Sequence, residues 1–166
     1  MKEVKEATRF ESLLGEYGPA IRRLCSAYRR DPRDRQDLFQ EIAVALWKAL
    51  PNFRNESSER TWLYRVAHNI AITDSIRRQR KRELEVPFEE TPPPATSGGD
   101  PRRSDLLDAV QRLAPVEREL ALLYLEGLTA REIADVLGIG EGNAAVRLTR
   151  LRQQLTRILN PNEVKA

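Results

Sequence analysis

Apolar and polar positions alternate with a helical period along much of the chain. The stretch RDRQDLFQEIAVALWKAL repeats apolar side chains every three or four residues, as on one face of an α-helix. We therefore predict a helix over Asp37 to Leu50 that stops at Pro51. An earlier helix is predicted over Ile21 to Arg30, separated by a break at Gly18-Pro19 from a shorter one before it. The predicted core stripe of the Asp37 helix comprises Leu38, Ile42, Ala45, Leu46 and Ala49.

A second helical pattern follows the polar loop PNFRNESSER. Thr61 can begin this helix, which continues to a cluster of five cations within Arg77 to Arg82. Its predicted core face holds Leu63, Val66, Ala67, Ile70 and Ala71. The opposite side is then expected to carry Trp62, Arg65, Asn69, Thr73, Arg77 and Arg80.

Beyond residue 101 the pattern predicts two short helices. Ser104 is expected to cap the first, Pro115 to lie in the first turn of the second, and Gly127 to follow its end in a left-handed conformation.

The last part of the chain has the pattern of a helix-turn-helix. Thr129 and Glu132 have capping-box spacing, Gly138 ends the short helix, and a longer helix is predicted from about Glu141 to Leu159. Its predicted core face holds Ala144, Leu148, Leu151 and Leu155. The outward face near its start presents Gly142, Val146, Thr149, Arg150 and Gln153.

The segment Glu83 to Pro101 contains three consecutive prolines and a Ser-Gly-Gly, which oppose both helix formation and core burial. We therefore predict an all-α protein of two small helical domains joined by a flexible Pro-rich linker, the C-terminal domain being the helix-turn-helix. The predicted ranges are 1–82, 83–103 and 104–166.

Charge is distributed unevenly, although the net charge of the 166 residues is only +3. Residues 54–82 carry eight Lys or Arg against three acids, whereas 83–100 carry five acids and no cation. Cys25 is the single cysteine, so no internal disulfide is expected and the thiol is predicted to be buried. The sequence holds no apolar run of membrane-spanning length, which favours a cytoplasmic protein without membrane insertion.

The outward face of the last helix is typical of a helix that enters the DNA major groove. Arg and Gln can hydrogen-bond base edges there, and other arginines can hold phosphates. The alternative is a helical hairpin with a solvated basic face.

The helix that starts near Thr61 combines aromatic, amide and guanidinium groups, a combination that suits unstacked bases. The preceding loop NESSER could close a pocket around an extruded base. Alternatively, Trp62 packs in the core, and spacing alone does not separate the two roles.

On the Asp37 helix, Gln40, Val44 and Trp47 form a second face beside the core stripe. This face predicts a protein contact, unless Trp47 instead completes the small core.

Three stretches together resemble the extracytoplasmic-function (ECF) sigma factors, of the sigma-70 family, of bacterial RNA polymerase. These are DLFQEIAVALW, FRNESSERTWLYRVAHNIAITDSIRRQRK and LAPVERELALLYLEGLTAREIADVLGI, which are similar to regions 2 and 4 of that family. The resemblance implies a promoter-specificity subunit with no catalytic activity, cofactor or metal. Its implied partners are core RNA polymerase, through the clamp helices of the largest subunit and the flap, as well as promoter DNA and an anti-sigma factor.

The resemblance also implies site residues. Contact with core polymerase is implied for Asp37, Leu38, Gln40, Glu41, Val44 and Trp47. Contact with the minus-ten element is implied for Asn55, Glu56, Ser57, Arg60, Trp62, Arg65, Asn69, Arg77, Arg78, Arg80 and Lys81. Contact with the minus-thirty-five element is implied for Gly142, Asn143, Val146, Arg147, Thr149, Arg150 and Gln153. The acidic linker would mimic a nucleic-acid strand inside the polymerase.

Other functions stay open on the residues alone. A stand-alone helix-turn-helix regulator would bind duplex DNA tightly without polymerase, and a helical adaptor would bind only proteins. An enzyme is disfavoured, because the sequence offers no phosphate loop, no nucleophile with a base partner and no metal cluster.

Overall fold

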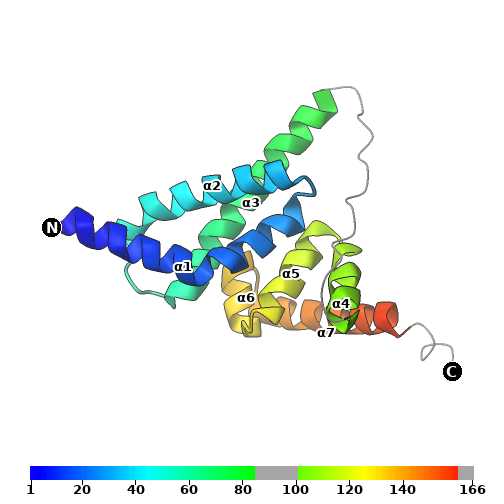
Figure 1. Ribbon diagram of the computed structural model, residues 1–166. Coiled ribbons are helices and arrows are strands. Elements are labelled where there is room, and N and C mark those ends of the chain that lie inside the picture. The colour runs from blue at the N-terminus through cyan, green and yellow to red at the C-terminus, as the bar shows by residue number, and fades with distance from the viewer. Residues whose placement is uncertain (85–100, 161–166) are drawn as a thin grey trace. The chain divides into compact units, whose positions relative to one another are not determined.

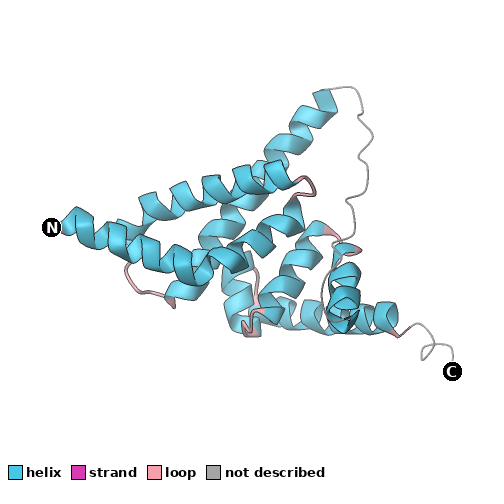
Figure 2. Ribbon diagram, in the orientation of Figure 1, coloured by secondary structure: helices cyan, strands magenta, loops and turns pink. Residues whose placement is uncertain are grey.

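The structure is a computed structural model that describes residues 1–84 and 101–160. Every regular element in these two ranges is helical, which confirms the predicted all-α fold class (Figure 1, Figure 2). The chain divides into two compact units, Met1–Pro93 and Pro94–Ala166. Most of the predicted linker, residues 85–100, lies outside the described residues, so its flexibility stays a prediction. The described ends of the predicted linker are helical: residues 83–84 end one helix and 101–103 begin the next.

Helix α1, Lys2–Tyr28, is continuous, so the predicted break at Gly18-Pro19 is wrong. Leu13, Ile21 and Leu24 are all buried, which means that the apolar stripe continues from one side of the proline to the other. A proline inside a helix costs about 3 kcal/mol. Burial of each Leu or Ile side chain contributes about 1.5–3 kcal/mol, so core packing outweighs the local penalty.

Helix α2, Pro32–Ala49, starts earlier than the predicted Asp37. The Asp31 carboxylate accepts hydrogen bonds from two backbone N–H groups of the first turn, at 2.7 and 3.3 Å, and Pro32 is suited to the first helical position. The helix ends where a single 3₁₀ turn, η1 (Leu50–Asn52), begins. Local capping therefore explains the start that apolar spacing alone missed.

Helix α3, Glu59–Leu84, begins before the predicted Thr61. The Ser58 hydroxyl accepts a hydrogen bond from the Thr61 N–H at 3.1 Å and so acts as the cap. Val66 and Ile70, both predicted to be core residues, are only half-buried. The face that is buried against α1 and α2 consists of Thr61, Trp62, Leu63, Tyr64, Ala67, Ala71 and Asp74. Cys25 is fully buried in the same core, as predicted.

The C-terminal unit begins with α4, Pro101–Gln111, and α5, Pro115–Leu125. The first of these helices already includes Ser104, so the predicted cap at that residue is wrong. Pro115 lies in the first turn of α5, and Gly127 follows that helix with φ 82°, both as predicted.

Helices α6, Ala130–Leu137, and α7, Glu141–Leu159, form the predicted helix-turn-helix. Thr129 and Glu132 form the predicted capping box, and Gly138 has φ 66° in the turn. Helix α7 packs against α4, α5 and α6. Its buried side chains are Ala144, Leu148 and Leu151, while Leu155 is half-buried. In residues 1–84 and 101–160, no helix combines the length and apolar character that crossing a bilayer requires.

Candidate nucleic-acid interface

A surface hollow lies between the loop after η1 and the first turns of α3. It has a volume of about 280 Å³, and its lining residues are Asn52, Phe53, Arg54, Glu56, Ser57, Trp62 and Arg65. The loop includes Asn55 with φ 58°, in the left-handed region that asparagine tolerates better than most residues. Aromatic rings, an amide and guanidinium groups thus converge on one small concave site.

Trp62 is a core residue as well as a lining residue of this hollow. Only 8% of it is exposed, whereas the sequence placed it on the outer side of the helix. The Phe53 ring covers it, with ring centroids 4.8 Å apart and planes inclined by 30°. Sequence reasoning missed Phe53, whose only signal was a single aromatic residue in a polar loop. The two predicted roles of Trp62, in the core and at a base site, are therefore compatible.

Other predicted minus-ten residues extend along α3. Asn69 and Arg80 are exposed, and Arg65 is half-buried. Arg65 and Asn69 are one helical turn apart on the same face. Thr73 donates its hydroxyl to the backbone carbonyl of Asn69 at 2.8 Å. A polar strip thus continues from the hollow along the helix.

Two cations of the basic cluster belong to an ion-pair network around Asp74. Arg77 contacts this carboxylate at 2.7 Å and Arg78 at 3.4 Å. Arg29, which follows the end of α1, makes a third and buried contact with it. Arg78 also pairs with Asp34 of α2 at 2.9 Å. The sequence predicted only phosphate binding for these two cations, yet they also tie α3 to the other helices.

The environment of Asp74 favours its ionised form. The carboxylate is 3% exposed, and this burial alone would raise its pKa. Hydrogen bonds from Arg29 and Arg77 outweigh burial and hold the pKa of Asp74 below its ordinary value. Helical spacing could have indicated the contacts of Arg77 and Arg78 with Asp74, which lie three and four residues away. It gave no sign of the contacts with Arg29 and Asp34, because these residues lie far from the cluster along the chain.

Helix α2 presents the exposed face predicted for a protein contact. Val44 is 51% exposed and Trp47 is 43% exposed. The Trp47 ring also meets Phe10 of α1 edge-on, with centroids 5.1 Å apart, so it both contributes to packing and reaches the surface. Leu38 is only 1% exposed, so its side chain belongs to the core and is not available for the predicted polymerase contact. The remaining predicted residues of this face are exposed: Asp37, Gln40 and Glu41.

Helix α7 exposes the whole predicted groove face. Val146 is an exposed apolar residue at 49%. Arg147 donates to the Asn143 side-chain oxygen at 3.2 Å, one turn earlier on the same helix. The other exposed members of this face are Gly142, Thr149, Arg150 and Gln153. Arginine, amide, hydroxyl and methyl groups therefore lie together on one helix, the combination that recognises bases in the major groove.

Comparisons with known proteins match both units. Residues 13–82 match the family model for Sigma-70 region 2, and residues 103–155 match Sigma-70, region 4. The chain is 29% identical over 161 residues to RNA polymerase sigma factor CarQ of Myxococcus xanthus, covering 94% of this chain and 92% of that one. It is 26% identical to ECF RNA polymerase sigma factor SigM of Mycobacterium tuberculosis, covering 90% and 76%. The crystal structure of the sigma factor RpoE with the anti-sigma factor NepR, from Bartonella quintana, matches in fold with a TM-score of 0.78 and 22% identity. That match covers 93% of this chain and 98% of the RpoE chain.

Proposed function

We propose residue-level roles from the premise that this chain belongs to the sigma-70 family and is an RNA polymerase sigma factor of the ECF type. Such a factor directs core polymerase to promoters through regions 2 and 4. For this chain we infer a region 2 domain over 1–82, a linker over 83–103 and a region 4 domain over 104–166. Factors of this kind are DNA-recognition subunits, and we infer that this one has no catalysis of its own and acts in the cytoplasm.

The observation that carries the proposal is the hollow at the start of α3. Glu56 and Ser57, which line the hollow, would surround a base extruded from the minus-ten element. The neighbouring loop residue Asn55 and Arg60 in the first turn of α3 would complete this base site. The exposed edge of Trp62 and the guanidinium of Arg65 would contact that base, and Asn69 would read the next one. A base stacked on an aromatic ring gains about 1–3 kcal/mol, which is comparable to the cost of unstacking it. Capture in the hollow would therefore offset the cost of extruding a base.

The basic end of α3 would hold the phosphates of the melted strand. The Arg77 side chain is 66% exposed although it pairs with Asp74, and Arg80 is exposed as well. Arg78 and Lys81 complete the proposed phosphate-binding cluster. Arg78 also pairs with two acids, so its substitution would change stability as well as DNA binding. Substitution of Arg80 therefore tests phosphate binding more directly.

The exposed face of α2 would dock on the clamp helices of the largest polymerase subunit. Val44 and Trp47 would form its apolar centre, a composition typical of the middle of protein interfaces. Asp37, Gln40 and Glu41 would supply its polar contacts. The RpoE structure holds an anti-sigma factor, and by analogy we infer that an anti-sigma factor regulates this chain.

Helix α7 would read the minus-thirty-five element as duplex DNA. Arg150 and Gln153 would bond base edges, Val146 would contact a thymine methyl group, and Arg147 would bind phosphate together with Asn143. A bidentate contact to a base is worth about 1–3 kcal/mol of discrimination. Gly142 and Thr149 would lie where the helix approaches the backbone of the DNA. Region 4 would also contact the flap of the polymerase.

Run-off transcription with sigma-free bacterial core polymerase and a genomic fragment library tests the proposal. Discrete start sites that depend on this protein are expected, and alignment of the transcripts gives both promoter elements. Absence of such transcripts, together with tight binding to particular duplexes without polymerase, would instead support a stand-alone regulator.

A pair of matched variants tests the region 4 assignment. Arg150→Gln is expected to weaken transcription from promoters with the minus-thirty-five element by about tenfold, the equivalent of one lost base contact. Arg157→Gln removes the same charge from a later turn of α7 and is expected to have little effect. Equal losses in both variants would contradict the assigned groove face.

A further inference from the structure

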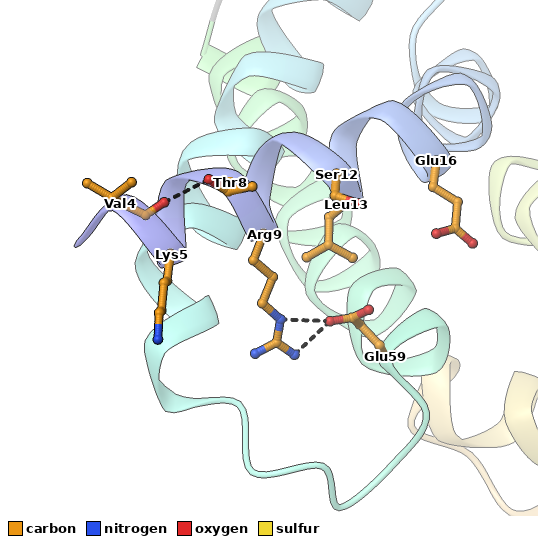
Figure 3. A pocket seen from close by; sticks show the side chains of 8 residues that line it. All are labelled: Val4, Lys5, Thr8, Arg9, Ser12, Leu13, Glu16 and Glu59. Atoms are coloured by element: carbon orange, nitrogen blue, oxygen red, sulfur yellow. Dashed lines mark hydrogen bonds and ion pairs between the residues drawn. The ribbon is translucent and has the colours of Figure 1, made fainter. Parts of the chain in front are cut away.

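One arginine on α1 contacts both ends of the loop that forms the proposed base site. The Arg9 guanidinium donates to a single oxygen of Glu59, from Nε at 3.1 Å and from Nη2 at 2.7 Å (Figure 3). The same guanidinium lies 5.5 Å from the centroid of the Phe53 ring. Phe53 is at the beginning of the loop, and Glu59 is the first residue of α3. Arg9 therefore bridges the two points at which the loop joins the helices.

The Phe53 ring connects Arg9 to the residues that line the proposed base site. Phe53 contacts both the guanidinium and Trp62, since the centroid of its ring is also 4.8 Å from that of the Trp62 ring. Phe53 and Trp62 both line the hollow, whereas Arg9 does not. Arg9 instead lines a separate hollow of about 420 Å³, on the α1 side of Glu59 (Figure 3). Any effect of Arg9 on a captured base must consequently pass through the loop.

The conformation of the middle of the loop depends on the contacts that hold its two ends. Arg54, Asn55 and Glu56 are all exposed. Asn55 has a positive φ, which asparagine tolerates better than most residues. At the α3 end, Ser58 bonds the Thr61 N–H and Arg9 pairs with Glu59. Loss of either anchor would let the loop sample other conformations.

We propose that Arg9 is a positioning residue for base capture: it fixes the loop between Phe53 and Glu59 in the shape that receives an extruded base. This inference rests on the proposed function of the hollow. Arg9 lies before residue 13, where the match to region 2 begins, so the role belongs to the N-terminal turns of this chain. Arg9 acts on the DNA only through Phe53 and Glu59.

The expected effect is moderate, because the pair is partly exposed. The side chains of Arg9 and Glu59 are 44% and 36% exposed, so water and salt weaken their attraction. The cation also faces a ring and donates twice to one carboxylate, which adds geometric restraint. We expect removal of Arg9 to reduce base capture by about 3- to 10-fold, and tenfold corresponds to about 1.4 kcal/mol.

The test uses the full chain in complex with core polymerase and a promoter fragment that the wild-type holoenzyme opens in run-off transcription. The fluorescent base aminopurine is placed at each position of the minus-ten non-template strand in turn, and its emission reports unstacking. Permanganate reactivity of unpaired thymines gives a second readout. Arg9→Gln is expected to lower the amount of unstacked base by about 3- to 10-fold. Arg9→Lys keeps the charge but not the paired donors, and it should recover part of the loss.

Lys5→Gln is the matched control. Lys5 is one turn earlier on α1 and lines the same hollow as Arg9, but its ammonium group points away from Glu59 (Figure 3). Lys5→Gln removes the same charge as Arg9→Gln, so a non-specific loss of attraction to DNA would appear equally in both variants. Thermal melting of each variant and its affinity for core polymerase should match the wild type. Those two readouts separate positioning from a general loss of structure.

A double-mutant cycle with Glu59→Gln isolates the contribution of the pair. If the pair positions the loop, Arg9→Gln and Glu59→Gln combined should reduce base capture no further than either variant alone. Wild-type transcription with equal base capture in Arg9→Gln and Lys5→Gln would overturn this inference and leave the proposed function intact. Additive losses in the cycle would overturn it too. Failure of the wild-type protein to support promoter-specific transcription would overturn both.

Discussion

Replacement of Asp74 with alanine is expected to remove much of the stability of the N-terminal unit. The carboxylate is 3% exposed and the paired Arg29 is 8% exposed, so truncation would strand a buried cation. Arg29 would keep hydrogen bonds from Nη1 to the Tyr28 carbonyl and the Ser75 hydroxyl, but these neutral acceptors do not balance its charge. Breaking a buried pair in this way costs about 3–5 kcal/mol. Since whole domains are stable by only about 5–15 kcal/mol, this is a large fraction.

The two tryptophans of the chain, Trp47 and Trp62, both lie in the N-terminal unit, so their fluorescence reports the unfolding of that unit in the full-length protein. A loss of about 4 kcal/mol lowers the urea midpoint by about 2 M when the slope is about 2 kcal/mol per M. Asp37→Ala removes an exposed acid from α2 and serves as the control, with an expected change within about 0.5 kcal/mol.

A double replacement separates the net contribution of the Arg29–Asp74 pair to stability from the cost of leaving one partner unpaired. Arg29→Met combined with Asp74→Leu removes both charges and keeps apolar volume, so it should be much more stable than Asp74→Ala. A cost below about 1 kcal/mol for Asp74→Ala, the size typical of an exposed pair, would refute the reasoning. A double variant as unstable as the single one would refute it as well, because packing rather than a stranded charge would then account for the loss.

Three further predictions concern pH, thiol reactivity and the turn of the helix-turn-helix. Because the pKa of Asp74 is lowered in the folded state, its contribution is complete above the unfolded value of about 3.9 and is lost as pH falls through the folded pKa. Below about pH 4 the stability gap between wild type and Asp74→Ala should therefore narrow, as urea titrations at several pH values would reveal. Burial raises the pKa of the Cys25 thiol to about 12, so a thiol reagent at pH 8 should modify the unfolded protein but not the native one. Rapid labelling of the native protein would contradict that burial. Gly138→Ala should destabilise the C-terminal unit by about 1–2 kcal/mol in thermal melts followed by circular dichroism. The cause is backbone strain at φ 66° alone, since an added methyl group would meet nothing within 4 Å. Gly142→Ala, inside α7 and equally open, is the control and should not destabilise the unit.

The C-terminal unit was largely predictable because its signals are local. The capping box of Thr129 and Glu132 and the turn glycine at 138 involve groups three or four residues apart. The exposed face of α7 also followed directly from the helical period, with Val146 outward as expected. The start of α4 was missed, although Pro101 is suited to a first helical position as Pro32 is in α2.

The N-terminal unit depended more on contacts between distant residues. Helical spacing did not separate a core role from a surface role for Trp62, and the fold buries it beneath Phe53. Spacing placed Leu38 in the core, where the structure has it, and only the resemblance implied a polymerase contact for this residue. The outcome for Trp62 depends on which neighbour covers the side chain, and a periodic pattern does not contain that information.

The sequence by itself therefore determined the helical class, the helix-turn-helix, its caps and the groups available to bind DNA. It did so because capping and periodicity arise from interactions within about one helical turn. Only the tertiary structure decided that α1 runs through Pro19, that Arg29 meets Asp74, and that Arg9 reaches Glu59. The last two contacts join residues 45 and 50 positions apart. Their partners are selected by the packing of three helices around one core, where burial energy rather than local preference sets the geometry.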